Sequence, residues 1–205
     1  MNRAQKTGAA VPPVTKKRAR GVEIVNKEDF IMKKAAVFLA DGFEEIEALT
    51  AVDVMRRAGI AAQTVSVCAK TVTGSHGIKV EADMTESEFD ASAYDAVVLP
   101  GGMPGAKILG ECKTVINTVT AFDAAHKLIA AICAAPATVL GMNGLAAGRK
   151  VTCYPSPAFI NVLENAHYTG SEVEKDGNLI TASGPKAAMA FALAICDWLD
   201  EKPAF

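Results

Sequence analysis

Short apolar runs alternate with amphipathic segments from Met32 onward. The runs Lys34–Leu39, Ala61–Val67, Ala96–Leu99 and Leu128–Ile132 are short and bounded by turn residues, and they predict buried strands. Helical patterns lie between or after them, at Glu45–Ala58, Thr114–His126, Pro136–Met142 and Lys186–Leu199. Strands that alternate with helices predict an α/β fold with a mainly parallel sheet and helices on both of its faces.

Shorter elements complete this prediction. Val72–Val80 indicates a short hairpin or a meander, and Val151–Cys153 indicates a strand. The residues Lys175-Asp176-Gly177-Asn178 indicate a turn between two strands, Glu172–Glu174 and Leu179–Ala182. In the last helix we expect Met189, Leu193, Cys196 and Leu199 to lie on one face.

Functional sites of parallel sheets form beyond the carboxyl ends of the strands. In this chain three loops follow predicted strands at that edge: Asp41–Glu47, Pro100–Gly105 and Cys133–Pro136. We therefore expect the chemistry to lie in these three loops.

Composition separates the first 31 residues from the rest. Residues 1–31 hold seven Lys and Arg against three Asp and Glu, whereas residues 32–205 hold fourteen against twenty. We expect a basic, disordered extension over 1–31 and one α/β domain over 32–205; the alternatives are a targeting or docking tail and an upstream start before Met32. An acidic body repels phosphate backbones, so the fold is not expected to bind nucleic acid.

No apolar run approaches the roughly 20 residues that cross a bilayer, and no membrane partner is expected. The five cysteines form no C-x-x-C pair, and no secretory signal precedes them. These features favour a reducing, cytoplasmic compartment. We expect the protein to bind neither a metal nor another cofactor.

The segment Ala131-Ile132-Cys133-Ala134-Ala135-Pro136 has the pattern of a nucleophile elbow. Small residues stand two positions before and after Cys133, where the sharp turn brings the chain close to itself. Pro136 suits the first turn of a helix, so Cys133 is expected at a helix N-terminus that lowers its pKa. The alternative is a small, buried and inert cysteine.

Two further loops supply partners for this cysteine. In Pro100-Gly101-Gly102, glycines expose backbone N–H groups, and the N–H groups of Gly102 and Ala134 could together form an oxyanion hole. Glu44 and Glu45 are expected to cap the first helix, whereas Glu47 lies a turn further on and can point toward Cys133. A carboxyl group held beside a thiolate tends to stay protonated.

From Lys33 to about Leu199 the chain resembles the ThiJ/PfpI superfamily, in the branch of the parkinsonism-associated protein and bacterial ThiJ-like proteins. The segments that carry the resemblance are FLADGFEEIEALTAVDVMRRAG, YDAVVLPGGMPGA, LIAAICAAPATVL and VEKDGNLITASGP. The resemblance implies a flavodoxin-like three-layer sandwich, a homodimer, a nucleophile at Cys133, a glutamic acid at Glu47, and backbone donors at Gly102 and Ala134.

We expect Gly101, His76 and Tyr154 to line the pocket. At the last two of these positions the chain departs from the family. Tyr154 stands where some members carry a histidine, and His76 where some relatives place an arginine. Tyrosine, with a pKa of about 10, is a poor base at neutral pH. His76 and His167 are expected at the surface or in structural roles, as lone histidines usually are.

The resemblance implies a cysteine-dependent glyoxalase or deglycase that acts on methylglyoxal, glyoxal or their protein adducts. The alternative is a non-catalytic redox sensor or chaperone, in which Cys133 is oxidised to a sulfinate. A peptidase is disfavoured because Ala134 stands where that branch has a histidine after the cysteine. A class I glutamine amidotransferase is excluded because no histidine is followed two residues later by glutamate.

Overall fold

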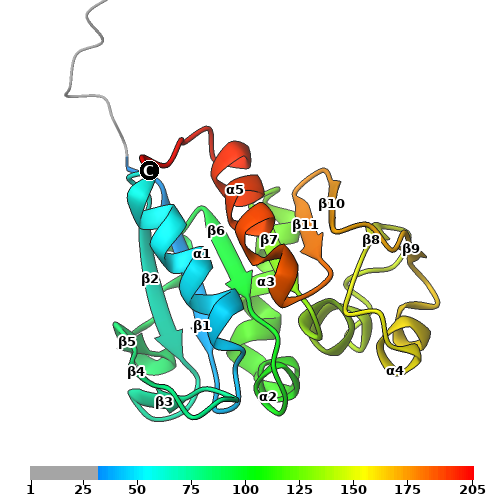
Figure 1. Ribbon diagram of the computed structural model, residues 1–205, viewed down its shortest axis with the longest axis horizontal. Helices are drawn as coiled ribbons and strands as arrows, with labels where there is room; N and C mark the ends of the chain where they lie inside the picture. The colour runs from blue at the N-terminus through cyan, green and yellow to red at the C-terminus, as the bar shows by residue number, and fades with distance from the viewer. Residues whose placement is uncertain (1–31) are drawn as a thin grey trace, which may run out of the picture. The chain divides into compact units, whose positions relative to one another are not determined.

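The computed structural model describes residues 32–205 as a sheet covered by helices (Figure 1). Its seven strands lie in the order β10-β11-β7-β6-β1-β2-β5, and all neighbours are parallel except β10 and β11. Their bounds are β1 Lys34–Leu39, β2 Ala61–Ser66, β5 Met84–Thr85, β6 Ala96–Leu99, β7 Leu128–Ile132, β10 Val173–Asp176 and β11 Leu179–Ala182. This is the flavodoxin-like α/β fold that the sequence predicts.

Helices cover both faces of the sheet. Side chains of β1 alternate between the two: Val37 and Leu39 belong to one apolar core, Ala36 and Phe38 to the other. The first core is covered by α1 (Glu45–Arg57) and α5 (Ala188–Trp198), which lie side by side in front of the sheet (Figure 1). The second is covered by α2 (Gly105–Glu111), α3 (Lys113–Ala124) and the π-helix η3 (Pro136–Gly141).

Short elements fill the connections. They are the strands β3 Thr71–Thr73, β4 Lys79–Glu81, β8 Lys150–Val151 and β9 His167–Tyr168, the helix α4 Pro157–Ile160, and the 3₁₀ turns η1 Glu86–Glu88, η2 Ala91–Ala93, η4 Asn161–Leu163 and η5 Pro185–Ala187. β3 and β4 form the expected hairpin.

Two local predictions are wrong. The strand expected at Val151–Cys153 is the two-residue β8, whose one strand partner within residues 32–205 is β9, because the chain then turns toward the elbow. β10 runs on to Asp176, so Lys175 and Asp176 belong to the strand and not to the turn. Of the face expected in the last helix, Cys196 and Leu199 are buried, as are Phe191 and Ile195, whereas Met189 is 49% exposed.

The site is positioned by the point at which the strand order reverses. From β1 the chain proceeds to β2 and β5 on one side, and β6, β7 and β11 follow on the other. The loops after β1 and β6 therefore diverge at a topological switch point, with the end of β7 beside them. These are the three loops that the sequence singles out.

None of the helices in residues 32–205 is long and apolar enough to cross a membrane. The expected basic extension, residues 1–31, lies outside the described part of the chain.

Candidate active site

Cys133 sits directly after β7 in a conformation that L-residues rarely adopt, with φ at +66°. Two backbone hydrogen bonds hold it: its N–H donates to Ala182 O at 2.9 Å, and its carbonyl accepts from Tyr154 N at 2.8 Å. Ala131 and Ala135 are fully buried on either side, and η3 starts at Pro136. The structure thus forms the elbow that the sequence predicts, and the neighbouring strand and loop maintain its strain.

Glu47 reaches the site from the first turn of α1, where it is fully buried. Its Oε2 accepts a 2.7 Å hydrogen bond from the Gly101 N–H, and its Oε1 is buried without a partner among the described residues. Burial raises the pKa of Glu47 to about 7, against the opposing effect of the hydrogen bonds with Gly101 and Cys133. A carboxyl group with this pKa exchanges its proton near neutral pH.

Gly101 is the point at which the two side chains meet. A Cβ at this position would lie 2.5 Å from Cys133 Cβ, 3.0 Å from its Sγ and 2.7 Å from Glu47 Oε2. Only glycine therefore fits between the thiol and the carboxyl group. Beside it, Gly102 takes a φ of +86°, with its Cα packed against the Gly42–Glu44 backbone.

The thiol has a raised pKa, not the lowered one expected from the sequence. Burial, the charge of Glu47 and the hydrogen bond with Glu47 raise the pKa of Cys133 to about 12, and the N–H groups of Gly102 and Ala134 only partly oppose this. The helix that follows is short, and its N-terminus does not outweigh burial and a neighbouring carboxylate. Part of this rise depends on the charge of Glu47: a proton on Glu47 removes the repelling charge, whereas burial still raises the pKa of the thiol.

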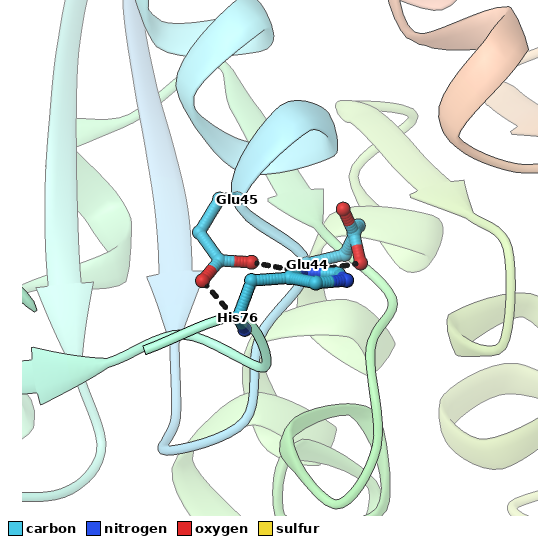
Figure 2. Close-up of side chains that lie close together, drawn as sticks. All are labelled: Glu44, Glu45 and His76. Carbon is cyan, nitrogen blue, oxygen red and sulfur yellow. Dashed lines mark hydrogen bonds and ion pairs between the residues drawn. The ribbon is translucent and has the colours of Figure 1, made fainter. Parts of the chain in front are cut away.

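The other residues expected at the site divide into two groups. Gly101, Gly102, Ala134 and Tyr154 all contact Cys133 or lie beside it. His76 instead belongs to a separate cluster with Glu44 and Glu45 (Figure 2).

In this cluster the His76 Nδ1 lies 2.9 Å from Glu45 Oε2 and 3.5 Å from Glu44 Oε2, which raises the pKa of His76. Glu45 Oε1 accepts the backbone N–H groups of His76 and Ile78. The two carboxylates therefore fasten the β3–β4 hairpin to α1. Glu44 is the N-cap residue of α1 and Glu45 lies in its first turn, as expected, but the Glu44 side chain makes no capping hydrogen bond. The ligand atoms of Glu44, Glu45 and His76 lie within 4.8 Å of one another, and the carboxylates are paired with the imidazole.

Sequence reasoning missed the segment after β11. A Cβ at Gly184 would lie 3.3 Å from the Tyr154 ring and 4.0 Å from Cys133 Sγ, so this glycine borders the thiol. Its signal was available: Gly184-Pro185 follows the carboxyl end of a strand, where sites form.

The site combines a strained cysteine elbow with a buried glutamate at the switch point of a parallel sheet. This combination places the chain among flavodoxin-like proteins that have a cysteine site. The family model described as DJ-1/PfpI family matches residues 33–197, and the chain belongs to this family.

Its relatives include named and structurally characterised proteins. Protein dj-1beta of Drosophila melanogaster is 41% identical over 174 residues, 83% of this chain and 91% of that protein. A cysteine-to-alanine mutant of a DJ-1 superfamily protein from Salmonella typhimurium has 40% identity and a TM-score of 0.78, covering 82% and 91% of the two chains. Oxidised DJ-1 of Toxoplasma gondii has 36% identity and a TM-score of 0.77, covering 82% and 90%.

Proposed function

We propose that this chain is a cofactor-independent hydrolase of the glyoxalase or deglycase type, with Cys133 as nucleophile and Glu47 as proton carrier. Its substrates are methylglyoxal, glyoxal or the adducts that these form with proteins. One observation carries the proposal: a nucleophilic side chain and a carboxyl group with a pKa of about 7 meet in one buried site.

In the reaction, the Cys133 sulfur adds to the aldehyde carbon, and the carbonyl oxygen takes up a proton to give a hemithioacetal. Glu47 then accepts the proton of that carbon and returns it to the neighbouring carbon, while the hydroxyl proton passes to the neighbouring carbonyl oxygen, which leaves a thioester. Water cleaves the thioester, releases the 2-hydroxy acid and restores the thiol. The net change is the addition of one water, so no external oxidant or reductant is needed.

The backbone N–H groups of Gly102 and Ala134 support this role. Both donate toward the Cys133 sulfur, beside the position where the hemithioacetal oxygen would form. We assign them the stabilisation of that oxygen. Tyr154, which replaces the histidine of some relatives, leaves Glu47 as the main proton carrier, so we expect turnover to be modest.

The test is formation of lactate from methylglyoxal. We expect activity in the wild type, complete loss in Cys133→Ser and a loss of about 10²–10⁴-fold in Glu47→Gln, the usual contribution of a positioned acid–base group. Cys112→Ser, which removes another partly buried thiol, is the matched control and should retain activity. Lactate formation that survives in Cys133→Ser contradicts the proposal.

A second candidate is a redox sensor or chaperone in the oxidative stress response. Two molecules of peroxide would oxidise the Cys133 thiol to a sulfinic acid and be reduced to water. A protonated Glu47 could donate a hydrogen bond to the sulfinate, and one relative is described as oxidised. Oxidation of Cys133 without turnover of methylglyoxal would favour this function.

We also propose a cytoplasmic location and a homodimeric state. All five cysteines are free thiols in the structure, which suits a reducing compartment.

A further inference from the structure

A crevice of about 440 Å³ opens beside the thiol. Its lining consists of Tyr154, Pro155, Ser183, Gly184, Pro185 and Lys186. Gly184 forms the boundary with the site, because its missing side chain would lie within 4.0 Å of Cys133 Sγ. No side chain at position 184 therefore separates the crevice from the nucleophile.

The walls of this crevice are largely apolar. The Tyr154 ring is 45% exposed and is held edge-on against Phe159, with ring centroids 6.4 Å apart at 87°. Two prolines lie beside it, and Lys186 is the single charged residue of the lining. An exposed, oriented aromatic ring between prolines suits an apolar or aromatic group, which it can stack against.

The size of the crevice exceeds what the smallest aldehydes need. A volume of about 440 Å³ falls in the range that accommodates drug-sized ligands. Methylglyoxal, which carries only a methyl group beside its two carbonyls, would leave most of this space unused. A larger substituent would remove apolar surface of both the ligand and the ring from water.

We propose that this crevice is a substituent pocket, and that the preferred substrates are 2-oxoaldehydes with an aromatic or similarly bulky apolar group. This inference rests on the proposed function and deepens it. The aldehyde carbon adds to Cys133 while the substituent stacks on Tyr154. The reaction remains the addition of one water, and an aryl 2-oxoaldehyde gives the aryl 2-hydroxy acid.

The test compares phenylglyoxal with methylglyoxal through the ratio of their kcat/KM values. Each value is normalised to the addition of the same aldehyde to N-acetylcysteine, which removes intrinsic reactivity. We expect the wild type to prefer phenylglyoxal at least tenfold and Tyr154→Ala to lower that ratio about tenfold, as loss of an aromatic contact does. The control is Trp198→Ala, which removes another exposed aromatic ring. This ring lies beside Lys33 and Asp95, which precede strands β1 and β6, whereas the site follows the ends of the strands.

A second readout separates this inference from the proposed function. Each aldehyde protects Cys133 from iodoacetamide to the extent that it adds to the thiol, whether or not turnover follows. Tyr154-dependent protection by phenylglyoxal without turnover would support the pocket and overturn the hydrolase. Turnover of both aldehydes with equal normalised kcat/KM values would overturn the pocket and leave the proposed hydrolase unaffected. A phenylglyoxal-to-methylglyoxal ratio that is unchanged in Tyr154→Ala would do the same.

Discussion

Glu47 and Cys133 constrain each other's protonation at the point where both contact Gly101. Burial and then the charge of Glu47 raise the pKa of the thiol, while burial raises the pKa of Glu47 itself to about 7. Two negative charges in this buried site are unfavourable, so we expect the pair to carry at most a single charge at neutral pH. The reactive arrangement is the thiolate with a protonated Glu47.

The raised pKa of Glu47 predicts a specific pH dependence of stability. Between its ordinary value of 4.5 and about 7, the folded state retains a proton that the unfolded state has lost. This contribution is therefore most favourable below pH 4.5 and declines as pH rises, by about 3 kcal/mol above pH 7.

Glu47→Gln removes this titration. We expect the free energy of unfolding, measured in urea from pH 4.5 to 8, to fall with pH more steeply in the wild type than in Glu47→Gln. Parallel profiles for the two proteins would show that Glu47 is not held neutral by the fold.

Gly101→Ala should separate the thiol from the carboxyl group. Its Cβ overlaps Cys133 Cβ at 2.5 Å, and a displacement of about 1 Å in a catalytic group costs roughly 100-fold in rate. Gly144→Ala is the control, since it also strains the chain, at φ +72°, but has no atom within 4 Å of the new Cβ. We expect lactate formation to fall only in Gly101→Ala; equal activity in both variants would contradict the role of this contact.

The φ of +66° at Cys133 predicts that the nucleophile costs stability. Glycine adopts this conformation without strain, so Cys133→Gly should be about 1 kcal/mol more stable than Cys133→Ala. Both variants should lack turnover. Urea unfolding measures the difference, and a more stable alanine variant would show that the elbow is not strained.

The proposed homodimer predicts a solution mass twice the 21.4 kDa of one chain. Ile46 on α1 is 55% exposed, and Ile78 on the hairpin is 52% exposed. The N–H of Ile78 donates to the carboxylate of Glu45, the residue before Ile46, so the two isoleucines lie near each other. Ile46→Glu should shift the light-scattering mass toward the monomer. Met142→Glu, at another exposed apolar residue, is the control. A monomeric wild type at micromolar concentration would contradict the dimer.

The sequence predicted the central strands well because their signal is local. β1, β6 and β7 are continuous apolar runs between turn residues, and their predicted bounds agree with the structure. The two-residue strands β5, β8 and β9 exist only through their pairing partners, which no local pattern reveals. The elbow was predictable for the same reason as β7, since its small residues lie next to Cys133.

Other features of the site depend on residues far apart in the chain. The sign of the Cys133 pKa shift was wrong in prediction because burial and the Glu47 charge outweigh the local helix terminus. His76 stands at a position that lines the pocket in some relatives, but here the Glu45 carboxylate holds it in another cluster, in the surface role expected of a lone histidine. The crevice next to Tyr154 could not be predicted from the sequence, because it forms where the segment after β11 lies beside the elbow.

The most direct test of the link between Glu47 and Cys133 is the pH dependence of Cys133 alkylation by iodoacetamide, resolved by peptide mass spectrometry. In Glu47→Gln the repelling charge is absent, so its thiol should ionise at lower pH. We expect this variant to react faster than the wild type above pH 7, with the difference shrinking as Glu47 becomes protonated below pH 7. Identical rate profiles for the two proteins would contradict the claim that Glu47 controls the charge of Cys133.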